Sequence, residues 1–447
     1  MHRYIPNAQS DKEKMLQAMG AESIESLFVD IPAQLRMDRD LDLEPAYSEM
    51  EIARRMGELA SKNVGTDQLV SFLGAGAYDH FVPTVVNHMS GRSEFFTAYT
   101  PYQPEISQGT LTTIFEYQSM ICELTGMDVA NASLYDGSNA CVEAAMLSCN
   151  LSKKKKRFLV STTVNPEYRE VMHTYFKFRD FELEEIPMKD GETDYEAMAD
   201  MLDKDVAGVL VQSPNFFGVI EDVERTCAMT KEHKAVSIVS VDPISLALLK
   251  PPGELGADIV IGEGQSLGND LNLGGPYLGF FATTNKLVRK IPGRICGQSV
   301  DADGQRAFVL TLQAREQHIR RFKATSNICS NQGLIVTRAT MYMAAMGKEG
   351  MRDVAGQSFQ KAQYLYNKLI ATGKFEPVFQ KPFFKEFALK AKKPVAEINA
   401  ALLEKGFLGG FDLNTKYPME NTVLLAVTEK RSKAEMDKFV ELMEVIG

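Results

Sequence analysis

The chain has 447 residues, and its 49 Lys and Arg against 59 Asp and Glu give a formal net charge of −10, so we expect no nucleic-acid partner. Hydrophobic residues make up 45% and charged residues 24%, and no apolar run approaches the roughly 20 residues that span a bilayer, which predicts a soluble protein without a membrane partner. The polar start predicts no signal peptide, and six scattered cysteines without CxxC spacing predict free thiols in the cytoplasm and no metal site.

Residues 1–65 are predicted to form a helical arm. Apolar residues recur with helical spacing in Asp11–Met19 and in Glu44–Ser61, and Pro32 between them disfavours one continuous helix. So short a segment cannot bury its own apolar face. We therefore expect the arm to lie on the main domain or on another chain.

Residues 66–331 alternate between apolar strands and helices. The predicted strands are Phe158–Ser161, Phe181–Ile186, Val206–Val211, Val236–Val241 and Ala257–Gly262, and the predicted helices begin at Pro166 and cover Tyr195–Leu202 and Asp222–His233. This alternation is typical of a large α/β domain with a mostly parallel sheet. In such sheets the ligand binds beyond the carboxyl ends of the strands.

Residues 332–447 are predicted to form a smaller α/β domain. Phe383–Leu389 and Thr422–Val427 alternate like strands, and Val395–Lys405 and Ser432–Glu444 have helical spacing. The alternation in these strands indicates a sheet with one covered and one solvated face.

The segment Asp136-Gly137-Ser138-Asn139 precedes helical spacing in Cys141–Cys149. Small residues at a helix start expose free N–H groups, which together with the helix dipole can hold an anion such as a phosphate. Alternatively, Asp136 or Ser138 is an ordinary N-cap. The segment alone leaves both interpretations open.

A second candidate, Asp242, follows the predicted strand Val236–Val241. A carboxylate there can pair with the protonated ring nitrogen of a pyridine cofactor, although an Asp before Pro243 also commonly begins a turn. A small-residue helix start followed by a strand and an Asp is the order found in the aminotransferase-like pyridoxal-phosphate (PLP) enzymes of fold type I.

In that class the next strand presents a lysine that binds the cofactor covalently. Here the predicted strand Ala257–Gly262 is followed by Gln265 and Ser266, and the nearest lysines, Lys250 and Lys286, fall outside the strand end. Without an amine at that position the covalent bond cannot form. The order of elements thus resembles a PLP enzyme whose key residue is absent.

The sequence resembles the glycine decarboxylase family, the P-protein of the glycine cleavage system, and is most similar to subunit 1 of its two-subunit bacterial form. The segments that carry the resemblance are Arg3–Pro6, Phe72–His80, Phe96–Gly109, Ala132–Ser138, Arg315–Arg321 and Ala324–Cys329. In this family the cofactor lysine lies in a His-Lys-Thr segment of the other subunit, and the corresponding stretch here holds Gln265 and Ser266.

The resemblance implies a glycine decarboxylase subunit that is inactive alone and has no catalytic residue of its own. PLP is then bound covalently to the lysine-bearing subunit 2, glycine is decarboxylated there, and the aminomethyl group passes to the lipoyl arm of the H-protein. The family further implies a heterotetramer with two subunits of each kind. Asp136–Asn139, Asp242, Gln265 and Ser266 would line a vestigial cofactor pocket. Two alternatives remain: a self-sufficient PLP enzyme that uses Lys250, and a non-catalytic scaffold or regulatory subunit with a vestigial PLP pocket.

The loop Tyr99–Gly109 contains two prolines together with phenol, amide and carboxylate groups from Tyr99, Tyr102, Gln103 and Glu105. We expect this stiff loop to reach the partner's active site and to shape the glycine or lipoyl pocket. The alternative is a rigid interface loop without a chemical role.

Two further segments contain candidate site residues. The basic stretch Arg315–Lys323 is expected to form an interface, and a phosphate clamp across the dimer is the other possibility. His80 stands beside Asp79 in the sequence, but neighbours in sequence need not pair in space, and we expect a packed or surface histidine.

Overall fold

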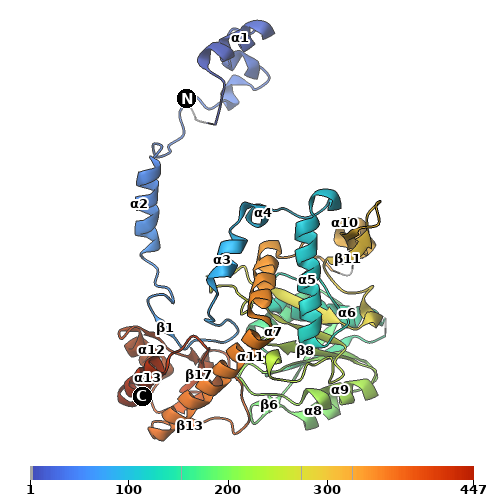
Figure 1. Ribbon diagram of the computed structural model, residues 1–447, viewed down its shortest axis with the longest axis vertical. Helices are drawn as coiled ribbons and strands as arrows, with labels where there is room; N and C mark the ends of the chain where they lie inside the picture. Colours follow the sequence, from blue (N-terminus) through green and yellow to red (C-terminus); the bar gives the residue numbers. More distant parts are fainter. Residues whose placement is uncertain (1–3, 153, 273, 325) are drawn as a thin grey trace. The chain divides into compact units, whose positions relative to one another are not determined.

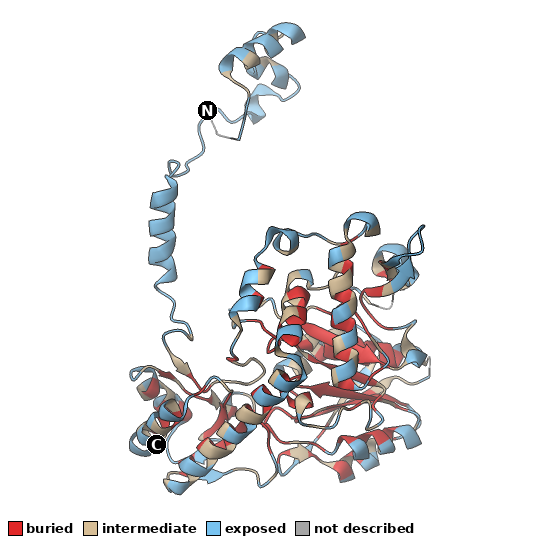
Figure 2. Cartoon of the chain, viewed as in Figure 1, coloured by how far each residue is buried: buried red, intermediate tan, exposed pale blue. Residues whose placement is uncertain are grey.

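A computed structural model of the chain describes residues 4–152, 154–272, 274–324 and 326–447. The chain forms two compact units, Met1–Val64 and Gly65–Gly447. The first unit contains the helices α1 (Gln9–Met19) and α2 (Glu49–Ala60), and none of its described residues is buried (Figure 2). Helix α2 begins later than the predicted Glu44 because Ser48 and Glu51 form a capping box at its start.

The second unit is built around a seven-stranded sheet (Figure 1). Its strands, in spatial order, are β2 (Val129–Ala130), β10 (Gly279–Thr283), β9 (Ile259–Glu263), β8 (Val236–Val241), β7 (Val206–Gln212), β3 (Arg157–Ser161) and β4 (Glu182–Ile186). The five strands from β9 to β4 are parallel to one another, and β10 runs antiparallel to both β9 and β2. The predicted α/β fold with a mostly parallel sheet is confirmed.

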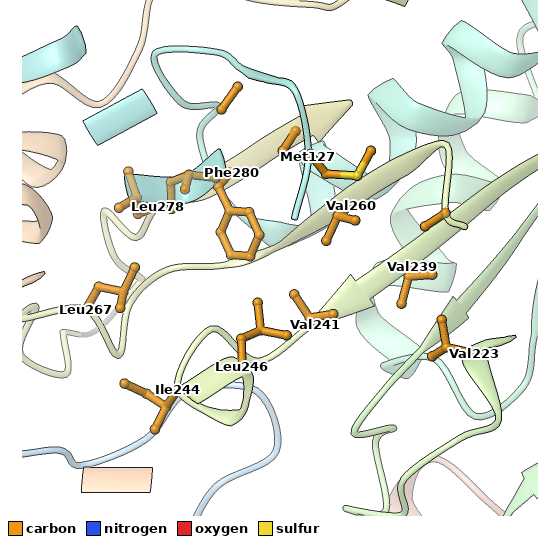
Figure 3. Close-up of a cluster of buried hydrophobic side chains, with 14 of the residues drawn as sticks. Met127, Val223, Val239, Val241, Ile244, Leu246, Val260, Leu267, Leu278 and Phe280 are labelled. Carbon is orange, nitrogen blue, oxygen red and sulfur yellow. The ribbon is translucent and has the colours of Figure 1, made fainter. Parts of the chain in front are cut away.

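Helices cover both faces of this sheet, which explains why its strands are almost continuously apolar. Alternate residues of β8 and β9 enter different core clusters: Val239 and Val260 face one side, and Ile238 and Ile259 face the other. The first side also holds α5 (Gln108–Thr125), α8 (Tyr195–Met201) and α9 (Val223–Glu232), and the second holds α6 (Gly137–Leu151) and α7 (Pro166–Phe176). Figure 3 shows the first cluster beneath β8, β9 and β10.

A smaller antiparallel sheet lies near the end of the chain. It has the order β13 (Phe375–Pro377), β14 (Glu386–Ala391), β17 (Thr422–Ala426) and β16 (Phe411–Asp412), and α12 (Val395–Leu403) and α13 (Lys433–Ile446) supply apolar residues to its core. The predicted start of β14 at Phe383 was wrong by three residues. Phe383 instead bridges to Val219, and the N–H of Phe384 donates to the oxygen of Gly218, so this stretch belongs to the junction with the large sheet.

The remaining elements join these two sheets or extend from them. Helix α11 (Gly333–Ala371) runs from α3 (Thr84–Ser90) and α5 to the small sheet, with non-helical backbone at Gly347. The other described elements are the helices α4 (Ser93–Phe96) and α10 (Gln317–Arg320), the hairpins β11 (Ile295–Val300) with β12 (Arg306–Thr311) and β5 (Met188–Lys189) with β6 (Glu192–Thr193), and the parallel pair β1 (Val70–Ser71) and β15 (Phe407–Leu408). Within the described residues, no helix has the length and apolar character needed to cross a bilayer.

Candidate functional site

The carboxyl ends of β7, β8 and β9 meet the small sheet at a cavity of about 40 Å³, which we call the central cavity. Its lining includes Asp242 after β8, Glu263 at the end of β9, and Lys385 immediately before β14. Below this edge the loops that follow β8 and β9 are held by the buried residues Leu246 and Leu267 (Figure 3). The strand ends therefore carry polar side chains on a rigid apolar base.

Asp242 is ion-paired within the chain. Its Oδ2 lies 2.7 Å from the Nζ of Lys385, and the two side chains are only 12% and 2% exposed. The Lys385 ammonium also lies 3.6 Å from the centre of the Tyr78 ring and 2.9 Å from Nε2 of His80. Lys385 thus holds the position where a cationic ring nitrogen would meet Asp242.

His80 is part of the same buried network and does not pair with its neighbour Asp79. Because an ammonium can only donate, Nε2 of His80 accepts from Lys385, and its Nδ1–H donates to Oε2 of Glu429 at 2.6 Å. Burial acts to raise the pKa of Glu429, but the hydrogen bonds from His80 and from the N–H of Phe81 outweigh it and hold the pKa below its usual range. Asp79 instead pairs with Lys430 and Arg431.

The start of α6 is occupied by two carboxylates. Asp136 is the N-cap, and its Oδ1 accepts from the N–H of Asn139 at 2.8 Å and from Oγ of Ser138 at 2.6 Å. The next free donor, the N–H of Gly137, donates to Oε2 of Glu263 at 2.9 Å. Desolvation raises the pKa of Glu263 to about 7, while the N–H groups of Gly137, Leu278 and Gln265, which all donate to its oxygens, favour the ionised form. The helix start is therefore capped, and the N–H groups of Gly137 and Asn139 are already used.

Gln265, at the place of the missing lysine, is only 1% exposed and fully hydrogen-bonded. Its Oε1 accepts from the N–H of Tyr78 at 2.9 Å, and its Nε2 donates to the oxygens of Tyr78 and Asn269 at 3.0 and 2.7 Å. Ser266 beside it is buried. Lys250 is exposed and is not among the residues that line the central cavity.

A wider cavity of about 700 Å³ opens beside the central one, and we call it the wide cavity. Asp136, Glu167 and Glu263 line it, while its described lining residues include no Lys, Arg or His. Ligand pockets usually exceed about 300 Å³, so the central cavity is too small, and the wide cavity presents carboxylates where a phosphate would need cations. The residues present do not fit PLP.

The proposed partner-facing loop lies at a different place. Tyr99 is 84% exposed and Tyr102 is 59% exposed, and Gln103 and Glu105 are also exposed. Beneath the loop is a third cavity of about 230 Å³, the loop cavity, which is lined by Tyr99, Ser330 and Asn331 among others. The loop residues thus face outward and do not line the central cavity.

The loop is supported from below by Arg294, which no sequence motif marks as a site residue. Its Nη2 donates to the Tyr102 hydroxyl at 3.3 Å, and its Nη1 donates to Oγ of Ser330, also at 3.3 Å. The C-terminal end of the loop is fixed by Gln108, whose amide exchanges two hydrogen bonds of 2.9 Å with the backbone of Phe308. Arg315, expected at an interface, turns inward to donate to the oxygen of Ile291, whereas Phe322 in the same basic stretch is 90% exposed.

Comparison with known proteins identifies the family. The profile of the glycine cleavage system P-protein matches residues 2–443. The chain belongs to the P-protein family. It is 55% identical to the probable glycine dehydrogenase (decarboxylating) subunit 1 of Moorella thermoacetica over 444 residues, which cover 99% of each chain, and 52% identical to that of Bacillus cereus over 447 residues, the full length of both.

Solved structures agree with this family. A glycine decarboxylase (P-protein) of the glycine cleavage system, in an inhibitor-bound form, is 40% identical over the full length of both chains, with a TM-score of 0.91. Glutamate decarboxylase from Lactobacillus brevis, only 12% identical, covers 93% of this chain and is covered to 96%, with a TM-score of 0.68, and shows the shared fold. The predicted family and the fold type I architecture are both confirmed.

The site residues that were not predicted from the sequence are mainly Lys385, which pairs with Asp242, and Glu263, which accepts from Gly137. Lys385 and Glu263 each stand within or beside an apolar strand, and their partners are 143 and 126 residues away in the chain. Lys385 could be recognised as a site residue only from a fold in which the start of β14 lies near the end of β8.

Proposed function

We propose that this chain is the non-lysine subunit of a heteromeric glycine decarboxylase. Together with a lysine-bearing second subunit it would decarboxylate glycine and transfer the aminomethyl group to the lipoyl arm of the H-protein. The curated relatives that match over the full length are named as subunit 1, which supports a two-subunit enzyme. A cytoplasmic heterotetramer of two subunits of each kind is the assembly that we expect.

The observation that carries this proposal is the state of the strand end after β9. Gln265 stands there in place of a lysine, and Lys385 neutralises Asp242. This chain therefore lacks the amine that PLP requires, its central cavity is too small, and its wide cavity presents carboxylates to a phosphate. We infer that PLP, which supplies an electron sink for the decarboxylation, is held covalently by the other subunit.

Within that complex, we propose that this chain contributes the loop Tyr99–Gly109. Tyr99, Gln103 and Glu105 are exposed, while Arg294 braces the loop through the Tyr102 hydroxyl and Gln108 braces it through Phe308. Nδ2 of Asn331, which lines the loop cavity, is buried and has no hydrogen-bond partner among the described residues. A braced polar loop beside an unpartnered donor favours a surface that binds polar groups from another molecule and helps to position glycine or the lipoyl arm.

The test is the exchange of labelled CO₂ with the carboxyl group of glycine. The chain alone should show no exchange with PLP and H-protein, and exchange should appear when the lysine-bearing subunit is added. Exchange by the chain alone would contradict the proposal and favour the self-sufficient alternative with Lys250.

Tyr102→Phe separates an active loop from a passive scaffold. It retains the ring over Arg294 and removes only the hydroxyl, so the complex should still assemble by size-exclusion chromatography while the exchange rate falls. Tyr366→Phe in the small-sheet core is the matched control, since that ring packs against Phe383 and Phe387. Equal exchange rates for both variants and the wild type would favour a non-catalytic scaffold.

A further inference from the structure

The site expected to hold a cofactor contains two charges that the chain itself supplies. One is the ammonium of Lys385 against Asp242, and the other is the carboxylate of Glu263 at the start of α6. A PLP molecule would bring a cation to the first place and an anion to the second. The two internal groups therefore have the same signs as the two ends of the missing ligand.

The internal cation is held on three sides. Asp242 Oδ2 lies at 2.7 Å, His80 Nε2 at 2.9 Å, and the Tyr78 ring centre at 3.6 Å from the ammonium. An ammonium that is 2% exposed remains in place only while such partners compensate for its lost hydration. Its removal would leave Asp242 as a poorly solvated, unpaired charge.

The internal anion is held by backbone donors. Oε2 of Glu263 accepts from the N–H of Gly137, and Oε1 accepts from the N–H groups of Gln265 and Leu278 at 2.9 and 2.8 Å. Two of these donors belong to the start of α6 and to the segment that follows β9. A carboxylate thus receives the N–H group that a phosphate at this helix start would use.

These contacts also join three parts of the chain. Asp242 follows β8 and Glu263 ends β9 of the large sheet. Lys385 adjoins the small sheet, and Tyr78 and His80 belong to the segment Gly74–His80. That segment is further held by Glu386, the first residue of β14, which accepts from the N–H of Ala75 at 2.7 Å and from the hydroxyl of Tyr78 at 2.5 Å.

We propose that the central cavity is an internally ligated pocket, in which Lys385 and Glu263 replace the cation and the anion of a cofactor, and in which Lys385 also ties the two sheets to Gly74–His80. The closure of this pocket is then independent of the missing lysine. Restoring an amine at position 265 does not restore a cofactor site, because the charge partners and the space remain occupied.

Gln265→Lys in the full-length chain tests this directly. The variant is incubated with PLP, reduced with borohydride and mapped by peptide mass spectrometry, with the exposed Lys250 of the same sample as the internal reference. We expect residue 265 to carry no more label than Lys250. Selective labelling of residue 265 would overturn the proposal.

Lys385→Met provides a second test that does not depend on the folding of Gln265→Lys. Hydrogen exchange of the amides in residues 74–80 and 386–391 should become several-fold faster than in the wild type, because both segments lose a shared anchor. Lys155→Met is the control, since the Lys155 ammonium is also bonded within the fold, to the oxygens of Val206 and His233. Unchanged exchange in both segments of Lys385→Met would overturn the proposal. Both tests use this chain without its partner, so their outcome is distinct from that of the proposed function.

Discussion

The guanidinium of Arg294 lies 5.1 Å from the ring centre of Tyr102, with its Nη2 3.3 Å from the phenol oxygen. The Arg294 side chain is 4% exposed, and Oε2 of Glu316 lies 3.7 Å from its Nε and balances its charge. A buried cation therefore braces an exposed loop from below. The loop is held in shape before any other molecule binds to it.

Arg294→Lys should weaken this support while retaining the charge opposite Glu316. A lysine cannot contact Tyr102, Ser330 and Glu316 at once, because it lacks the planar fork of arginine. A loss of about 1–2 kcal/mol of positioning energy corresponds to roughly a tenfold lower exchange rate in the complex. The measurement is CO₂–glycine exchange at saturating partner subunit.

Arg306→Lys is the matched control for that change. Arg306 also lies over an aromatic ring, with its guanidinium 5.6 Å from the centre of Phe308, but it is exposed on β12. We expect its exchange rate to remain close to that of the wild type. If Arg294→Lys behaves like Arg306→Lys, Arg294 has no positioning role.

The Asp242–Lys385 pair should show strong energetic coupling. Asp242→Asn or Lys385→Met alone leaves a buried charge without its partner, which typically costs about 3–5 kcal/mol of unfolding free energy. The double variant should lose less than the sum of the two single losses. Urea unfolding of the four proteins measures the coupling.

The exposed pair Lys189–Glu196 is the reference for this cycle. Its N–O distance is 2.9 Å, but the side chains are 58% and 80% exposed. Exposed pairs contribute about 0–1 kcal/mol, so its cycle should give a coupling near zero. Strict additivity at Asp242 and Lys385 would contradict a mutually dependent pair.

Gln265→Leu should destabilise the segment Gly74–His80. The substitution removes the amide that serves both the N–H and the oxygen of Tyr78, and each buried group left unpaired costs about 1–3 kcal/mol. Thermal unfolding should therefore shift to lower temperature. Gln357→Leu, which removes only a surface bond to Asp353, should leave the transition nearly unchanged.

A pH-dependent effect is expected at Glu143 on α6. Burial raises its pKa from 4.5 to about 7. The folded chain thus binds this proton more tightly than the unfolded chain, and the resulting stability is fully present below pH 4.5 and is lost as the pH rises through 7. Glu143→Gln stays neutral, so above pH 7 it should be more stable than the wild type by roughly 3 kcal/mol, at about 1.4 kcal/mol per pKa unit.

The difference between Glu143→Gln and the wild type should disappear near pH 4.5, where both side chains are uncharged in the fold. Urea midpoints at several pH values from 4.5 to 8 measure it. Glu232→Gln, at an exposed position at the end of α9, is the control and should follow the wild-type profile. A constant difference at all pH values would exclude titration of Glu143 as the cause.

The parallel strands were predictable because both of their faces are buried. Val236–Val241 is apolar except for the buried Ser237 and Ser240, and it matches β8 at both ends. Strand β10 and helix α11 were missed. The first follows the Gly274–Pro276 turn and is only five residues long, and the second has glycines at positions 347, 350 and 356 that interrupt its helical pattern.

The candidate site was predictable only where the signal is local. The cap at Asp136 depends on neighbours two and three residues away, and Asp242 follows a strand directly. The role of Lys385 depends on β14 lying beside β8, and that of Arg294 depends on a loop almost 200 residues earlier in the chain. Such pairings arise from tertiary packing, which the spacing of residue types along one sequence does not encode.

The segment Gly74–His80 is fastened to both sheets at once, through Gln265 on one side and Glu386 on the other. The two sheets cannot separate without breaking the hydrogen bonds that Gln265 and Glu386 make to this shared segment. We therefore expect the large and the small sheet of this chain to move as one rigid body, without a hinge that opens between them during turnover.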